Sequence, residues 1–356
     1  MALLASGYFL MLVPAVLLPF SLALRMPLFG FLIVFLLGTV TRSVFGDVVG
    51  SAPEWTESAA TVLEWLPTVT SVTYFFSTAL TIAMLRTAPG RRGLPFYVEF
   101  GASMWAVYLL VSCLAHELLH RKDKTSRNLG RVLSGIIGYP VLEIEHQWHH
   151  HHIGDARSRE CARVDETVWE FSFSRIRRIL MTMSNHDFLW VNTRSRHMGA
   201  GLVLASTVAV CTAGAFGWAL GFAGVVLFVC VSMTVWWSLQ VINYIQHWGL
   251  GSATRRESNA VAIAWEDRCR LQYWLTLGIS FHQAHHEEGD APYYRMGFRH
   301  KSPKAPASYF FLFFASLVPP LWRYLMLPAL ERWKASPESQ PSAGRKLVCI
   351  PSSRNT

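Results

Sequence analysis

Histidine is the residue type whose number and spacing point to chemistry in this chain. Thirteen of the fourteen histidines lie between residues 116 and 286, and most of them are clustered. The first cluster, His116-Glu117-Leu118-Leu119-His120, places two imidazoles four residues apart. Positions i and i+4 of a helix share one face at a separation of about 6 Å, so this pair can chelate one metal ion.

Two further clusters and one separate histidine extend this pattern. His146, His150 and His151 read H-x-x-x-H-H inside a run of four histidines at 149–152. A later segment reads H-x-x-H-H, and another histidine ends an apolar run. We interpret His149 and His152 as bystanders or as groups that support a ligand. The nine candidate metal ligands are His116, His120, His146, His150, His151, His247, His282, His285 and His286.

Nine imidazoles are more than a single metal ion needs. A catalytic zinc takes about three protein ligands, whereas two irons with four or five imidazoles each would use all nine. Imidazole suits iron among other transition metals. Neutral ligands leave the charge of the ions uncompensated, so we expect nearby carboxylates to orient the imidazoles and balance the charge. The carboxylates close in sequence are Glu117, Asp123, Glu145, Asp155, Asp267 and Glu287.

The elements that must position these histidines are predicted to be membrane helices. Hydrophobic residues make up 52% of the 356 residues and charged residues only 15%, against about 25% charged in soluble domains. A helical span needs roughly 20 apolar residues, and six stretches qualify: 7–24, 27–42, 66–85, 97–115, 201–220 and 221–242. We therefore predict an all-α polytopic membrane protein with one domain over 1–333, and a tail at 334–356 whose Ser and Pro content indicates disorder.

The order of the spans predicts that the histidine clusters meet on one face of the membrane. Four spans precede His116, and two more separate the second cluster from His247. The Lys/Arg-rich segment 121–178 marks that face as cytoplasmic, which predicts a histidine-rich helical cap on the cytoplasmic side of the inner membrane. Arg86, Arg91 and Arg92 would lie on the outer side and argue against this orientation. The net charge of +9 resides beside apolar runs, so membrane topology explains it better than nucleic-acid binding.

The order and spacing of the clusters resemble the membrane fatty-acid desaturase and hydroxylase superfamily. Further motifs make the chain similar to its alkane 1-monooxygenase branch, which includes xylene-type methyl hydroxylases. The resemblance covers roughly residues 95–330, and the spacer between His146 and His150 departs from it, because Gln-Trp-His replaces the usual Gly-containing sequence. The motifs are the segment 116–123, the segment 243–250, Trp265-Glu266-Asp267 with Leu271-Gln272, and Pro319-Pro320-Leu321-Trp322-Arg323.

This resemblance implies a non-haem di-iron centre held by the nine histidines, with O₂ as co-substrate. It implies hydroxylation of an unactivated C–H bond, at a terminal methyl, of an alkane, alkyl-aromatic or fatty acyl chain. Electrons would come from a separate rubredoxin or ferredoxin and its NAD(P)H-dependent reductase. Small electron-transfer proteins are often acidic, so the docking candidates are the basic residues Arg121, Lys122, Lys124 and Arg127.

Two other functions remain open at this point. Desaturation or oxidative decarboxylation of a fatty acid on the same centre would share the first hydrogen abstraction with hydroxylation. A non-enzymatic metal transporter would instead place polar or charged residues inside the spans, and the predicted spans have almost none. None of the six cysteines forms a C-x-x-C pair, which argues against a fused rubredoxin or ferredoxin module.

Overall fold

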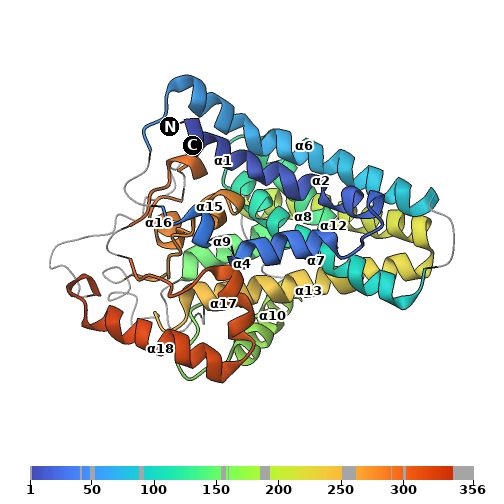
Figure 1. The fold of residues 1–356 in the computed structure, drawn as a ribbon. Coiled ribbons are helices and arrows are strands. Elements are labelled where there is room, and N and C mark those ends of the chain that lie inside the picture. Colours follow the sequence, from blue (N-terminus) through green and yellow to red (C-terminus); the bar gives the residue numbers. More distant parts are fainter. Residues whose placement is uncertain are drawn as a thin grey trace.

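The structure is a computed structural model that describes residues 2–40, 42–48, 53–87, 92–153, 158, 160–184, 193–250, 262–289, 291–299 and 302–339. Throughout these ranges the regular secondary structure is helical, and extended backbone pairs only at two isolated bridges, Asp47 with Cys269 and Glu266 with Lys304. The predicted all-α class is therefore confirmed. Long helices lie side by side, and several short ones gather at one end of them (Figure 1).

Five helical stretches are long and apolar enough to cross a membrane within the described ranges. The first, Ala5–Ala23, comprises α1 (Ala2–Gly7), a 3-10 turn (Tyr8–Met11) and α2 (Leu12–Ala23). The other four extend beyond the predicted spans and are separate helices. They are α6 (Glu57–Thr87), α7 (Leu94–Leu119), α12 (Thr193–Leu220, apolar from Gly199) and α13 (Phe222–His247).

The stretch predicted as a span at 27–42 is not one membrane-length helix. It consists of α3 (Phe29–Phe31), a π-helical turn (Leu32–Leu36), α4 (Leu37–Val40) and α5 (Arg42–Phe45). Its first turn starts inside the bundle, where the Phe31 amide donates to the Ser103 hydroxyl of α7 at 3.1 Å. These elements hold 16 helical residues, which rise only about 24 Å, short of the roughly 30 Å hydrocarbon thickness.

The short helices form the end of the molecule that carries the histidines. Asp123 caps α8 by accepting the Ser126 amide at 2.7 Å. Gly138, at φ +70°, lets the link between α8 and α9 approach α13, because a Cβ there would lie 1.9 Å from the Ser232 hydroxyl oxygen. These elements are α8 (Lys124–Ile136), α9 (Leu142–His152), α10 (Val168–Ser184), α15 (Arg270–Leu275), α16 (His282–Glu287), α17 (Tyr309–Ser316) and α18 (Pro319–Ala335).

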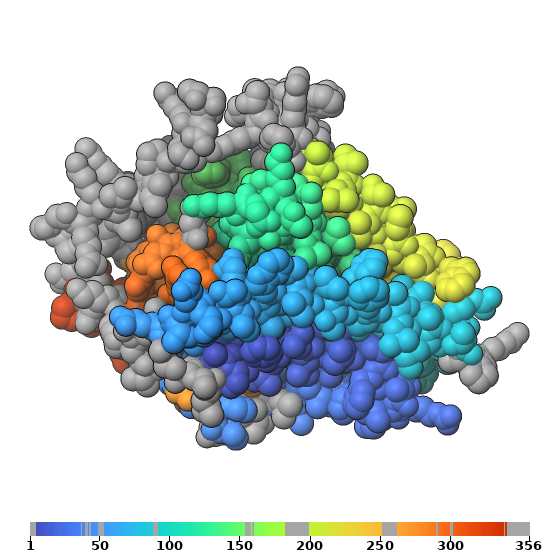
Figure 2. All heavy atoms as spheres, turned by 90° about the horizontal axis from the view of Figure 1, so that it is seen from above, coloured from blue at the N-terminus to red at the C-terminus, as the bar shows by residue number. Residues whose placement is uncertain are grey.

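The start of α6 lies against this same end. Tyr293 donates its hydroxyl proton to the Leu63 carbonyl at 2.8 Å, and Tyr294 donates to the Glu64 carboxylate at 2.8 Å. In the space-filling view, α6 crosses the molecule and its first turns abut the segment around α15 and α16 (Figure 2). α6 therefore starts, and α7 and α13 end, at the end of the bundle where the histidines lie.

The boundary predicted at residue 333 is crossed by regular structure. Helix α18 continues to Ala335, and a 3-10 turn follows at Pro337–Ser339. The rest of the predicted tail, 340–356, lies outside the described residues. The single-domain division at 1–333 stays a prediction.

Candidate metal centre

Five histidines from three helices form the first group. His116 lies in the last turn of α7 and His120 directly follows that helix, His146 and His150 come from α9, and His285 comes from α16. One ring nitrogen from each lies within 4.8 Å of those of all the others. The Nε2 atoms of His120 and His146 are 2.6 Å apart, and those of His150 and His285 are 3.0 Å apart.

Four histidines form the second group beside the first. His247 ends α13, His282 and His286 lie four residues apart on α16, and His149 comes from α9. The His282 Nε2 atom is 3.1 Å from the Nε2 atoms of both His247 and His286. Helices α9 and α16 contribute to both groups, which places the two groups side by side.

The ninth position is filled by His149, whereas the sequence pattern predicts His151. Helix α9 turns His146, His149 and His150 to one side, because positions i, i+3 and i+4 share a face. Gln147 and His151, four residues apart, are exposed on another face. The structure thus brings together eight of the nine predicted histidines and adds one that was interpreted as a bystander.

The grouped imidazoles fit a pair of transition-metal ions. Burial and the mutual repulsion of their charged forms hold the pKa values of His146, His150, His282, His285 and His286 well below the usual value for histidine. A neutral imidazole offers one unprotonated nitrogen as a ligand. Close contacts between two Nε2 atoms leave little room for protons, whereas nitrogens converging on one point are what an imidazole-bound metal requires.

Two members of the second group are fixed from behind. The His247 Nδ1 donates to the Ile263 carbonyl at 2.7 Å. The His149 Nδ1 contacts the Glu160 carboxylate at 2.8 Å, and an ionised carboxylate can only accept, so the imidazole donates. Both bonds place the proton on Nδ1 and leave Nε2 free to face the group. Carboxylates and carbonyls in this position orient metal-binding histidines and raise their basicity.

Helix α16, which supplies three of the nine imidazoles, is anchored by side chains from the preceding loop and from within the helix. Glu266 is buried and accepts the Ala284 amide at 3.1 Å and the Arg299 amide at 3.2 Å. Gln283 accepts the amides of Ile263 and Ala264 at 2.8 and 3.0 Å. These bonds tie the helix to the segment that also holds His247.

The carboxylates predicted to support the centre have different partners. Glu117 pairs with Arg121 at 2.9 Å, and Asp123 caps α8. Asp267 is buried, where burial raises its pKa to about 6, and accepts the amides of Cys269 and Tyr309. Glu287 pairs with Arg299 at 3.2 Å.

The remaining two predicted carboxylates, Glu145 and Asp155, have separate outcomes. Glu145 accepts from Arg175 at 3.1 Å and from Gln240 at 2.9 Å. Asp155 lies outside the described residues.

Sequence reasoning missed Glu160 and Arg175. Glu160 follows the second histidine cluster by several residues and belongs to no motif. Arg175 stands in a run of arginines that reads as a topology signal, yet its side chain is only 5% exposed and pairs with both Glu145 and Glu160. Only the tertiary fold brings α10 against α9, so no local pattern could have identified this pair.

A cavity of about 110 Å³ opens beside both histidine groups. His116 and His146 of the first group line it together with His149 and His282 of the second. The remaining walls come chiefly from the facing ends of α7 and α13. They include Ser112, Cys113, Leu142, Leu239, Ile242 and Ile279. A small hydrophobic group entering this cavity would therefore approach both histidine groups.

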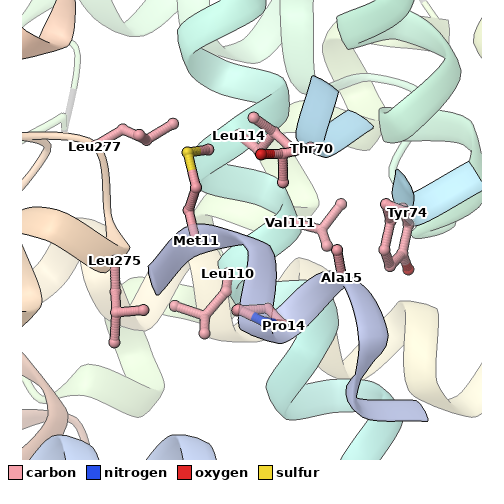
Figure 3. A pocket seen from close by; sticks show the side chains of 10 residues that line it. All are labelled: Met11, Pro14, Ala15, Thr70, Tyr74, Leu110, Val111, Leu114, Leu275 and Leu277. Carbon is pink, nitrogen blue, oxygen red and sulfur yellow. The ribbon is translucent and has the colours of Figure 1, made fainter. Parts of the chain in front are cut away.

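A second, smaller pocket of about 10 Å³ lies in the membrane bundle below this end. Met11, Pro14 and Ala15 of the first membrane stretch face Leu110 and Val111 of α7 across it (Figure 3). Apart from Thr70 and Tyr74 its lining is apolar, so this pocket offers few hydrogen-bond partners.

The residues predicted to dock an electron donor differ in their exposure. Lys122 and Lys124 are exposed just beyond His120, and Arg127 is half-buried. Arg121 is only 13% exposed and pairs with Glu117 and Glu64, so it joins α7 to α6 within the protein. The exposed part of this basic segment is therefore smaller than its sequence indicates.

Several known proteins are similar in sequence to this chain. Alkane 1-monooxygenase 1 of Pseudomonas aeruginosa is 27% identical over 270 residues, which are 71% of this chain and 67% of that protein. Alkane 1-monooxygenase 2 of Alcanivorax borkumensis is 25% identical over 228 residues, 62% of this chain and 60% of that protein. The hydroxylase component of xylene/toluene monooxygenase from Pseudomonas putida is 25% identical over 234 residues, with the same coverage.

The aligned regions span 60 to 67% of the length of these relatives. The sequence model of the family described as fatty acid desaturase matches residues 94–331, which is more than half of the chain. This match runs from the start of α7 to α18 and includes all nine grouped histidines. It follows that the chain belongs to the fatty acid desaturase family.

Proposed function

We propose that this protein is an integral-membrane, O₂-dependent di-iron monooxygenase that hydroxylates a hydrophobic substrate. The observation that carries the proposal is the convergence of nine imidazoles into groups of five and four, with two members of each group lining one cavity at the end of a membrane bundle. Membrane helices α7 and α13 end at this cavity, so an apolar substrate dissolved in the bilayer would lie close to the site. The similarity to alkane 1-monooxygenases favours an unactivated C–H bond, at a terminal methyl, as the site of reaction.

Iron is the metal we propose, with one ion in each group. The bound irons would supply the redox chemistry that activates O₂ and oxidises the C–H bond. Groups of four and five imidazoles exceed the roughly three protein ligands of a catalytic zinc. Nine neutral ligands add no charge of their own, and the buried carboxylate of Glu160 contacts one of them, His149, while it also pairs with Arg175.

The residues of the chain contribute positioning and the exclusion of water. Helices α7, α9, α13 and α16 fix the imidazoles, and the bonds from Ile263 and Glu160 set the orientation of His247 and His149. Leu142, Leu239 and Ile242 give the cavity apolar walls. An alkyl terminus bound against these apolar walls would lie next to both groups, while Glu145, Arg175, Asn243 and Gln246 line the polar part of the cavity.

The electron donor in this proposal is a rubredoxin or ferredoxin with its NAD(P)H-dependent reductase. Exposed Lys122 and Lys124 lie beside His120 and would attract an acidic donor. The positive-inside rule supports placing this face in the cytoplasm and the protein in the inner membrane. At the other end of the bundle, Arg92 donates to the Leu85 carbonyl at 2.7 Å and its guanidinium lies over the Phe96 ring. Because Arg92 has these partners within the protein, it is weaker evidence that this end of the bundle faces the cytoplasm.

Hydroxylation is favoured over the two alternatives. Desaturation or oxidative decarboxylation would begin with the same hydrogen abstraction, but the similar curated proteins named above are monooxygenases. Metal transport would call for ionisable residues inside the spans. The most apolar windows of the five membrane-length helices contain at most two Asp, Glu, Lys or Arg residues each.

The test is to purify the protein in detergent, count its iron, and supply O₂ and a reduced rubredoxin or ferredoxin pair with candidate substrates. Alkanes, alkyl-aromatics and free fatty acids are fed separately, and products are identified by mass spectrometry. We expect two irons per chain and a terminal alcohol, with His116→Ala and His285→Ala as inactive controls. Alkenes or shortened chains as products would instead support the alternatives, and full activity in either variant would refute the histidine assignment.

A further inference from the structure

We infer that this chain builds the ninth position of its metal centre from His149, held by Glu160 as a positioning residue, and not from His151. The inference rests on the proposed di-iron function and concerns how its second metal site is made. The sequence pattern H-x-x-x-H-H would assign the position to His151. The run of four histidines at 149–152 makes two readings of the motif available, and the fold selects between them.

The first observation is the direction in which each side chain of α9 points. The helix runs from Leu142 to His152 without a break, so each side chain is turned about 100° from the one before it. His149 is 6% exposed and its ring centre lies 4.9 Å from that of His247 and 5.1 Å from that of His286. His151 follows two residues later and is exposed. Bringing it to the second group would require the helix to rotate or unwind after His146.

The hydrogen bond from His149 to Glu160 is the second step. Glu160 is 1% exposed, and its carboxylate lies 2.8 Å from His149 Nδ1. A carboxylate buried at this depth needs partners that compensate its charge. With its Nδ1 proton committed to Glu160, His149 turns Nε2 toward His247, His282 and His286. This is the arrangement in which a carboxylate orients a histidine bound to a metal.

Arg175 makes Glu160 a fixed partner. Its guanidinium pairs with Glu160 through Nη1 and with Glu145 through Nη2 at 3.1 Å. The Arg175 Nε donates to Gln240 of α13 at 2.7 Å, and Gln240 in turn donates to Glu145 at 2.9 Å. Helices α9, α10 and α13 are thereby locked around the histidine.

A purely structural role for this network makes different predictions. If Glu160 only joined helices, then Glu160→Gln and Glu145→Gln would have the same effect, because both carboxylates accept from Arg175. A positioning role concerns Glu160 alone, since its contact with His149 reaches the second group. Metal content and the spectrum of each iron therefore separate the two roles, whereas stability alone does not.

The first experiment compares His149→Ala and His151→Ala in the full-length protein. Both are expressed with ⁵⁷Fe, purified in detergent, and measured for iron per chain and by Mössbauer spectroscopy. We expect His149→Ala to retain about one iron and to lose one of two spectral components, while His151→Ala keeps two. His149→Gln, closer in size, serves as a second variant if His149→Ala does not fold. Two irons in His149→Ala together with loss of one in His151→Ala would overturn the inference.

The second experiment tests Glu160 with a matched control. We expect Glu160→Gln to weaken iron binding at one site by about 10- to 100-fold, the usual effect of removing an outer partner of a histidine ligand. Glu160→Asp should restore part of it, and Glu145→Gln should keep two irons. Equal iron loss in Glu160→Gln and Glu145→Gln would reduce the network to a structural role. Absence of iron from the unsubstituted protein would instead contradict the proposed function itself.

Discussion

The two histidine groups lie side by side but are built differently. The first has five imidazoles, and two of them, His116 and His120, lie four residues apart at the C-terminal end of α7, where the His120 amide donates to the His116 carbonyl at 3.3 Å. The second has four imidazoles, which come from α9, α13 and α16. His149, His247 and His282 of the second group are buried, whereas only His285 of the first group is buried to that degree. The second group thus depends more on tertiary structure and has no spare ligand.

The groups also differ in the hydrogen-bond partners of the imidazole Nδ1 atoms. A carboxylate and a backbone carbonyl fix His149 and His247 in the second group. In the first group, the buried Nδ1 atoms of His116 and His285 have no hydrogen-bond partner among the described residues. In the second group the buried Nδ1 atoms of His282 and His286 have no such partner either. Hydrogen bonds therefore orient two of the four imidazoles of the second group, whereas the first group relies on ligand number and helix geometry.

The largest effect is expected from His247→Ala. It reduces the second group from four imidazoles to three and removes the ligand anchored on Ile263. We expect iron to fall from two to about one per chain and product formation to fall by more than about 100-fold, the upper end of what loss of an outer partner causes. Iron analysis and substrate turnover measure this. Two irons in this variant would contradict the assignment of the second group.

His120→Ala tests whether the first group tolerates a loss. Four imidazoles would remain, the number with which the second group is complete. We therefore expect nearly two irons per chain and turnover lowered by about 10-fold, the lower end of the range for perturbed metal sites. The same assays apply. If His120→Ala lost as much iron as His247→Ala, the fifth imidazole of the first group would give it no tolerance to the loss of a ligand.

The sequence predicted the first group more fully than the second, for a physical reason. His116 and His120 share a helix face wherever that helix lies, because four residues make about one turn. The choice between His149 and His151 depends on where α9 begins and which face it buries, and this is set by packing against α7 and α12. A run of four histidines carries no information on that phase.

The supporting residues were predicted least well. Glu160 lies against His149 where Arg175 of α10 pairs with it. The sequences of α9 and α10 taken separately do not predict that these two helices pack together. The span predicted at 27–42 is not among the five membrane-length helices of the described residues, and a π-helical turn lies within it. Its apolar composition indicates burial. The hydroxyls of Ser21 and Ser103 accept the amides of Gly30 and Phe31, so this helical stretch begins inside the bundle.

Glu266→Gln probes the helix that both groups share. Its two carboxylate oxygens accept the amides of Ala284 and Arg299, and an amide side chain would leave one of these buried donors unpaired. We expect the free energy of unfolding to fall by about 1–3 kcal/mol. Thermal unfolding in detergent measures it. Since α16 supplies His285 to one group and His282 and His286 to the other, iron should fall in both groups together.

The control for this variant lies on the same helix. Glu287 is about one-third exposed and pairs with Arg299 at 3.2 Å. An ion pair of this exposure contributes under about 1 kcal/mol, so Glu287→Gln should unfold close to the unsubstituted protein. Equal destabilisation by the two substitutions would show that Glu266 does not anchor α16.

The smallest effect is expected from Asp123→Ala, which separates capping from support of the centre. Asp123 follows His120 by three residues, and its carboxylate accepts the Ser126 amide at 2.7 Å. Loss of an N-cap costs about 1 kcal/mol. We expect thermal unfolding to shift accordingly, Asp123→Asn to restore it, and both variants to keep two irons. Iron loss in Asp123→Ala without recovery in Asp123→Asn would instead give the first group a carboxylate partner like Glu160, and the contrast between the groups would disappear.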